Sequence, residues 1–410
     1  MRRRGIARGA AAIRSRYAPG VKHAHDPDEY RLLHAGALLS LFCVGVYMSS
    51  FGPALPFIAD DMGVSLDTAG LLLTAIFTGS ILASAGVAIW LHGRHPRQLT
   101  IIGVASATVG VLLIGIAPDW PLVLLGGAAL GTGDGLIVAA LHILMAQTSR
   151  DAAAAINRLN LYFAFGATLG PVWSAGVLEA TDERWIVYAG IAALTSVTLA
   201  LLIAAAAPGA TEIEVPEEEF RLPGTPTAWI MGGVLFMYVG AEFGLGSWVS
   251  SYTRATAGVG VLAGGLLTAG YWGALAIGRM ISGVYFSRQR EPSALLAASA
   301  AGAGIASLVL ALSSGNLAVA GAAAFGAGLC LGPVWPTTVA IASEGALAST
   351  TAATVTMGNS GGLLLPWLQG KILVGAGATQ GVAVTAALCA LMFVIVMGFR
   401  ARHVATVPAT

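Results

Sequence analysis

The sequence predicts an all-α membrane protein in which twelve transmembrane helices form two bundles of six. The first observation behind this prediction is composition. Of the 410 residues, 56% are hydrophobic and only 10% are charged, whereas about a quarter of a soluble chain is charged. The second observation is a series of twelve apolar stretches, each long enough to cross a bilayer as a helix. The third is an internal repeat that relates the two halves of the chain.

The predicted spans follow one another with mostly short connections. One polar stretch rich in proline, glycine and glutamate, residues 207–226, separates the sixth span from the seventh, as expected for a linker between two bundles. We therefore expect bundles over residues 32–206 and 227–402, a basic N-terminal tail over residues 1–31, and a C-terminal tail over residues 403–410. The predicted spans cover residues 34–58, 67–91, 98–117, 120–147, 155–178, 184–206, 227–253, 261–287, 293–313, 316–343, 349–374 and 380–399.

Lysine and arginine residues set the expected orientation, because short loops rich in these residues stay in the cytoplasm. With the N-terminus placed inside, sixteen of the 21 Lys and Arg residues fall in the tails, the linker and the loops of the cytoplasmic side. Only Arg184 and Arg254 fall in loops on the other side. We expect a multi-pass protein of the cell (inner) membrane, embedded in the lipid bilayer, with both termini and the acidic linker in the cytoplasm.

Three pairs of spans share motifs at nearly the same separation. The offset is 194 residues for the second and eighth spans, 195 for the fourth and tenth, and 192 for the fifth and eleventh. Parallel repeats of this kind are typical of transporters in which one half rocks against the other around a midplane site. The matched motifs are Leu-Leu-Thr-Ala at 72–75 and 266–269, Gly131 and Gly133 with Gly326 and Gly328, and Gly166 and Gly170 with Gly358 and Gly362.

Two carboxylic acids interrupt otherwise apolar spans. Counted from the cytoplasmic end, Asp134 lies roughly 20 Å into the fourth span and Glu242 roughly 22 Å into the seventh, at 1.5 Å per residue. An acid near the middle of a span costs at least about 2.5 kcal/mol on insertion scales, so it faces a polar path or a partner. We predict that Asp134 and Glu242 are proton-coupling groups, one in each bundle. The alternatives are a structural hydrogen bond from a permanently protonated Asp134 to the backbone of a neighbouring helix, and an ion pair of Glu242 that holds the two halves in one state.

Arg279 lies about 13 Å from the cytoplasmic end of the eighth span, by the same helical rise. A cation at that depth needs a partner. We expect Arg279 to act as a gate or charge partner, with Glu344 at the end of the tenth span as its partner. Snorkelling toward the cytoplasm and binding of an anionic substrate are the alternatives.

Over residues 32–402 the chain resembles the major facilitator superfamily, and several stretches resemble the fucose permease branch of that superfamily, the fucose:proton symporters. The resemblance implies the twelve-helix major facilitator fold and a sugar-like solute. The stretches that carry it are GTGDGLIVAALH at 131–142, NRLNLYFAFGATLGP at 157–171, VGAEFGLGSWVSSY at 239–252, GRMISGVYFSR at 278–288, GPVWPTTVAIA at 332–342 and GNSGGLLLPWLQG at 358–370.

The chain also departs from the pattern of this family. Trp90 and Ser287 stand where the superfamily has loop acids, so the cytoplasmic latch that those acids serve must be weakened or rebuilt. The fourth-span acid and asparagine of the branch correspond to Val138 and His142, and its first-span acid to about Gly52. The proton machinery of the branch therefore cannot be copied unaltered.

Further polar and aromatic side chains fall in spans where a solute could reach them. Hydroxyl groups of a solute need hydrogen-bonding partners, and a tryptophan face offers apolar surface to a sugar ring. Membrane-interface belts and helix packing are the alternative roles of the tryptophans. The candidates for the substrate cavity are His142, Asn160, Trp248, Trp272, Trp335 and Asn359.

We therefore predict a secondary transporter that works by alternating access, by proton-coupled symport of a small polar, sugar-like solute. Two alternatives stay open: a proton antiporter that exports amphipathic compounds or drugs, and a non-transporting membrane receptor or scaffold. No nucleophile–base pair, metal-ligand spacing or phosphate loop favours an enzyme, a metal site or a cofactor. The expected partners are a small-molecule substrate and the proton. We expect a monomer without affinity for nucleic acid.

Overall fold

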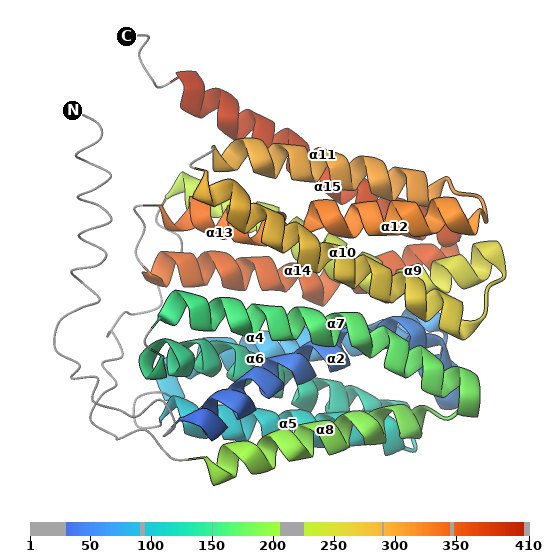
Figure 1. The fold of residues 1–410 in the computed structure, drawn as a ribbon. Coiled ribbons are helices and arrows are strands. Elements are labelled where there is room, and N and C mark those ends of the chain that lie inside the picture. The colour runs from blue at the N-terminus through green and yellow to red at the C-terminus, as the bar shows by residue number, and fades with distance from the viewer. Residues whose placement is uncertain are drawn as a thin grey trace.

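The computed structural model describes residues 30–90, 95–149, 151–205, 225–288, 291–344 and 348–405. Most of the predicted N-terminal tail and acidic linker, and residues 406–410, lie outside the described residues. The described residues form long helices that run back and forth, so that successive rods point in opposite directions (Figure 1). They are α2 (Arg31–Met62), α3 (Leu66–Ala69), α4 (Leu71–Trp90), α5 (Pro96–Ile116), α6 (Trp120–Thr148), α7 (Ala152–Thr181), α8 (Arg184–Ala204), α9 (Pro226–Ala257), α10 (Val261–Ser287), α11 (Pro292–Ala311), α12 (Leu317–Leu331), α13 (Val334–Ser343), α14 (Ala348–Gly375) and α15 (Ala378–Ala405).

Two of the rods are interrupted. Gly70 separates α3 from α4, and Gly332 with Pro333 separates α12 from α13. Proline has no backbone N–H to continue a helix ladder, which accounts for the second break. Counting each interrupted pair as one rod, the helices of the described chain make twelve rods, and the predicted fold class is confirmed.

Eleven membrane spans are apparent from length and apolar composition within the described residues. The remaining rod, α14, is long enough at 28 residues, but its first half carries several threonines, Asn359 and Ser360. It nevertheless packs in the middle of the molecule, against α9, α4 and α15. Since neighbouring helices surround it, α14 needs less apolar surface than a rod that faces lipid on most sides.

The two halves of the chain repeat the same packing scheme. Within α2–α8, the closest pairs are α2 with α7, α5 with α6, α4 with α6, α5 with α8, and α2 with α8. Each pair has its counterpart within α9–α15: α9 with α14, α11 with α12, α10 with α12, α11 with α15, and α9 with α15. The two halves are therefore two six-rod bundles of like topology, joined by α7 against α10 and α4 against α14.

Glycines allow the rods within each half to approach closely, and they reveal the structural register of the repeat. A Cβ atom at Gly131 would overlap the backbone carbonyl of Ile76, and a Cβ atom at Gly328 would overlap that of Tyr271. Gly131 and Gly328 thus hold equivalent places in the two halves. The sequence motif paired Gly131 with Gly326 instead, two residues earlier. In the same way Gly166 and Gly361 each lie against a carbonyl of the neighbouring rod, at Phe42 and Phe236. The duplication stands, with a register shifted by two to three residues in these spans.

The two ends of the bundle differ in how the halves meet. We call the end where α2 begins and α15 ends the terminal face, and the opposite end the distal face. Near the distal face, Glu179 accepts a hydrogen bond from the backbone N–H of Leu262, and the guanidinium of Arg254 lies 5.7 Å from the ring centre of Phe57. Gly52 also lies close to the carbonyl of Gly246 there. These contacts join the two halves on the distal side.

Candidate functional site

Asp134 is the middle residue of α6, and its carboxyl group is buried. Its Oδ2 atom accepts a hydrogen bond of 2.8 Å from the Oγ of Ser80 on α4. The sequence around it explains this proximity, because Gly131 and Gly135 flank it at helical spacing and both lie against backbone carbonyls of α4, those of Ile76 and Ser80. Among the described residues no cation forms an ion pair with Asp134.

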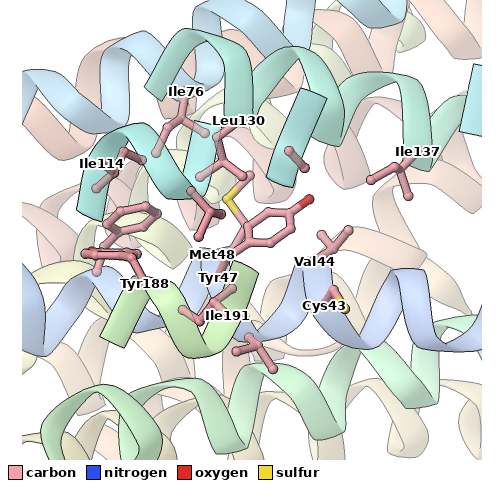
Figure 2. Packing of buried hydrophobic residues seen from close by; sticks show 14 of the residues in the cluster. Cys43, Val44, Tyr47, Met48, Ile76, Ile114, Leu130, Ile137, Tyr188 and Ile191 are labelled. Carbon is pink, nitrogen blue, oxygen red and sulfur yellow. The ribbon is translucent and has the colours of Figure 1, made fainter. Parts of the chain in front are cut away.

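A second hydroxyl lies near Asp134. Figure 2 shows the hydroxyl of Tyr47, on α2, directed toward α6 between Leu130 and Ile137. This ring is fully buried, and its hydroxyl has no hydrogen-bond partner in the described part of the chain. Tyr47 and Asp134 are close enough to interact electrostatically. The first half therefore holds a carboxyl group among hydroxyls and apolar side chains, and none of its described side chains supplies a counter-charge.

Glu242 is the buried acid of the second half, in the middle of α9, which is the counterpart of α2 and not of α6. Unlike Asp134 it is paired, since its Oε1 lies 2.8 Å from Nη2 of Arg279 on α10. The same Nη2 donates to the hydroxyl of Tyr238, one turn before Glu242, at 3.4 Å. The hydroxyl of Tyr271 donates to the backbone carbonyl of Glu242 at 2.9 Å. The second half thus holds a neutral acid–base pair.

Arg279 also reaches the other half. Its guanidinium carbon lies 5.7 Å from the ring centre of Phe163 on α7, within the range of a cation–π contact. Trp335 of α13 packs against Tyr238 with ring centres 6.1 Å apart. Glu242, Arg279, Tyr238, Phe163 and Trp335 thus form one cluster around the guanidinium of Arg279. The Glu242–Arg279 pair therefore faces the junction between the halves.

An aromatic contact lies between this pair and the distal face. Phe77 of α4 and Phe243 of α9 meet edge to face, with ring centres 5.0 Å apart, and Trp272 of α10 lies 5.6 Å from Phe243. Beside them the hydroxyl of Thr74 donates to the carbonyl of Leu363 at 2.7 Å. The contacts that Thr74, Phe77 and Arg279 make between the halves lie at the level of Arg279 or on its distal side.

Comparison with known proteins agrees with this architecture. The sequence profile described as the Major Facilitator Superfamily matches residues 37–366. The chain belongs to the Major Facilitator Superfamily. It is a multi-pass membrane transporter, not an enzyme, and the predicted family is confirmed. No curated protein matches the sequence.

Solved structures of this superfamily share the fold at low sequence identity. A variant of the E. coli fucose:proton symporter is 18% identical, with 90% of this chain and 99% of that chain covered and a TM-score of 0.63. A bacterial homologue of the human lysosomal transporter Spinster, in an inward-facing and occupied conformation, is 16% identical over 94% of this chain and 100% of that chain, with a TM-score of 0.75. A D-xylose–proton symporter is 13% identical, with 90% of this chain and 98% of that chain covered and a TM-score of 0.74.

The predicted pairing of Arg279 with Glu344 is wrong. Arg279 pairs with Glu242 and not with Glu344, which is exposed at the C-terminal end of α13. Counting residues placed the two Cα atoms of Arg279 and Glu242 at different depths, but the long arginine side chain spans that difference. The structure does contain an ion pair for Glu242, but both partners belong to the second half, so this pair does not join the halves.

The other predicted cavity residues fall into two groups. Trp248 and Trp272 are buried in the packing: Trp248 donates from Nε1 to the carbonyl of Pro366 at 2.8 Å, and Trp272 packs on Phe243. His142 and Asn160 bond to carbonyls of their own helices, at Val138 and Ile156. Asn359 and Trp335 are half-buried. Of this set, only Trp335 belongs to the cluster around Arg279.

The structure explains one of the departures from the family pattern, the one at Gly52. A side chain at Gly52, where the fucose permease branch has its first-span acid, would meet the carbonyl of Gly246 at 2.8 Å and Thr268 at 3.3 Å. The close approach of α2 to α9 in this arrangement thus excludes an acid there. The side chains of Trp90 and Ser287 lie outside the described residues.

Sequence reasoning missed Ser80, Tyr47 and Tyr238. The position of Tyr238, one turn before Glu242, was a usable signal, because residues four apart share a helix face. Ser80 and Tyr47 lie on other helices than Asp134, and nothing in a single sequence links them to it.

Proposed function

We propose that this transporter is a proton-coupled symporter of a small polar, sugar-like solute, with Asp134 and Glu242 as the protonatable groups. The observation that carries the proposal is the burial of Asp134 at the middle of α6 with a hydroxyl partner and no cation among the described residues. The terminal face lies in the cytoplasm in this proposal, and the protein acts as a monomer in the cell (inner) membrane.

Electrostatics supports a proton-carrying role for Asp134. A carboxylate without a counter-charge is expensive in an apolar interior, whereas the neutral acid needs only hydrogen bonds. Ser80 supplies one such bond, and the unpartnered hydroxyl of Tyr47 lies nearby. Packing around Asp134 therefore favours the protonated acid, and release of the proton requires that water reach the group. Alternating access supplies water from one side at a time.

The arrangement of the halves supports the same cycle. The distal side is held together by Glu179 with Leu262 and by Arg254 with Phe57. This is the arrangement expected of a carrier that faces the cytoplasm. The sugar-like solute rests on likeness to the fucose and D-xylose symporters, whose names give their substrates.

Proton movement in proteoliposomes tests the proposal. We expect addition of a transported solute, with L-fucose and D-xylose as the first probes, to acidify vesicles that contain a trapped pH dye. Asp134→Asn should abolish this acidification. Asp119→Asn is the matched control, because Asp119 is an exposed N-cap of the same helix and asparagine caps equally well. Solute-driven proton uptake that persists in Asp134→Asn refutes the role of Asp134, and extrusion of hydrophobic dyes coupled to proton entry favours antiport instead.

A further inference from the structure

The guanidinium of Arg279 has more donors than the protein uses. Its Nη2 serves both Glu242 and Tyr238, at 2.8 and 3.4 Å. Its Nε is buried and has no hydrogen-bond partner among the described residues. An arginine can hold a carboxylate through two parallel N–H donors, and the single bond to Glu242 leaves that capacity unused. A buried donor without an acceptor is costly, so an acceptor is expected at this place.

The site is accessible on the side of Arg279 and not on the side of Glu242. The Arg279 side chain is 25% exposed, whereas that of Glu242 is 4% exposed. A group that arrives from the junction between the halves therefore meets the guanidinium first. The contact of the guanidinium with Phe163 of the first half places it at that junction.

The surroundings fit a small organic solute with an acidic group. Phe163 covers the guanidinium from the first half, and Tyr238 with Trp335 lines it from the second. Aromatic faces and one hydroxyl suit a carbon skeleton with hydroxyl groups, and the free guanidinium donors suit an oxyanion. Side chains of both halves line this site. A solute bound here contacts both halves, as it must if it is to couple their movement.

We propose that Arg279 binds a carboxylate of the transported solute, so that the solute is a small hydroxylated organic acid and not a neutral sugar. This inference rests on the proposed symport function and narrows its substrate class. The arriving carboxylate competes with Glu242 for Arg279. Glu242, released from its cation, takes up a proton from the bulk solution through the water that enters with the solute, and so the site holds one cation and one anion before and after binding.

The charge balance follows from the groups that face Glu242. They are Arg279 and Tyr271 from α10 and Tyr238 from α9 itself. Only Arg279 carries a charge at neutral pH, and a second carboxylate on it would leave a net negative charge in a buried place. One proton taken up by Glu242 with each carboxylate removes that charge, so the binding step at this site is electroneutral.

Ligand-dependent melting of the purified protein tests the inference. The probes are D-glucuronate and D-gluconate, each compared at millimolar concentration with D-glucose, which lacks the carboxylate, and with sodium chloride at equal ionic strength. We expect the acids to raise the melting temperature of the wild type and D-glucose to leave it unchanged. In Arg279→Gln the affinity for the acid should fall on the order of tenfold or more, because a charge-assisted pair is lost.

Glu242→Gln separates binding from folding. This variant keeps Arg279 and removes its competitor, so we expect it to bind the acid more tightly than the wild type and with less dependence on pH. A merely structural ion pair would give a less stable protein without this gain. Equal stabilisation by D-glucose, stabilisation by acid that persists in Arg279→Gln, or no stabilisation by either acid would each overturn the inference.

Proton uptake in proteoliposomes distinguishes failure of the carboxylate site from failure of the symport proposal. If neutral sugars drive proton uptake in proteoliposomes and the acids do not, the carboxylate site is wrong while proton-coupled symport stands. If no solute moves protons, the symport proposal itself fails.

Discussion

The Oγ atom of Ser80 lies 2.8 Å from Oδ2 of Asp134, which brings a hydroxyl of α4 to the one carboxyl group within α6. Gly131 and Gly135 create this contact by removing the side chains that would hold the two helices apart. Ser80 therefore fixes the orientation of the acid to which we assign the proton.

Replacement of Ser80 by alanine should slow proton-coupled uptake and lower stability by about 1 kcal/mol, because the acid loses its hydrogen bond. Ser80→Thr, which keeps a hydroxyl, should retain more uptake than Ser80→Ala. Ser84→Ala, one turn further along α4, is the control, since the contact of Ser84 with Gly135 is long at 3.4 Å. Uptake and melting temperature report the result, and a Ser80→Ala variant unchanged in both would contradict the assigned role.

Gly166→Ala should destabilise the first half by about 1–3 kcal/mol, as over-packed contacts do. A methyl group at Gly166 overlaps the carbonyl of Phe42 on α2, whereas nothing lies within 4 Å of the same position at Gly176 on the same helix. Thermal unfolding in detergent of Gly166→Ala and Gly176→Ala measures the difference. Equal melting temperatures for the two variants would show that α2 and α7 do not pack as described.

Gly52→Trp should hold the distal side open and stop transport. An indole at this position cannot fit against Gly246, so the halves must separate there. A cysteine introduced by Val261→Cys, which lines a pocket at the distal junction, then becomes more reactive toward a membrane-impermeant maleimide. Gly176→Trp is the control for added bulk. Unaltered labelling together with normal transport would argue against the close approach of α2 and α9.

Acid should weaken the start of α5. The Nδ1 of His95 accepts a hydrogen bond from the backbone N–H of Arg97 at 3.2 Å, and burial together with the nearby Arg97 charge holds the pKa of His95 below its usual range. The folded protein therefore favours neutral His95. The cap contributes fully above the unfolded pKa of about 6.5, and its contribution is lost as the pH falls through the lower folded value.

Melting temperatures measured from about pH 7.5 down to about pH 5, where histidine titrates, test this linkage. We expect His95→Asn, which keeps a capping oxygen without a titratable group, to lose less stability on acidification than the wild type. A cap is worth about 1 kcal/mol. Parallel pH profiles for the two proteins would assign the acid sensitivity to other groups.

The rods and the two halves were predictable from the sequence because bilayer thickness and burial impose long apolar runs. The register of the repeat was less predictable. In spans made mostly of alanine and glycine, a shift of two or three residues produces nearly equal matches, and only the contacts of Gly328 and Gly361 with backbone carbonyls fix the equivalent positions.

The partners of the two central acids show a further limit. A depth scale along a helix locates Cα atoms, so it identified Asp134 and Glu242 as interior residues. The pairing of Glu242 with Arg279 depends on the reach and direction of a long side chain, and the bond from Ser80 depends on which faces of α4 and α6 meet. These are properties of packing between helices, which one sequence without its fold does not contain.

The contrast between a lone acid in one half and a paired acid in the other has an electrical consequence. When Asp134 gives up its proton, only the first half gains a net charge near the middle of the membrane, while the ion pair leaves the second half neutral. A membrane potential acts on uncompensated charge, with up to about 2.3 kcal/mol per elementary charge for each 100 mV. Voltage should therefore bias the return of the empty carrier and leave its loaded, protonated form almost untouched.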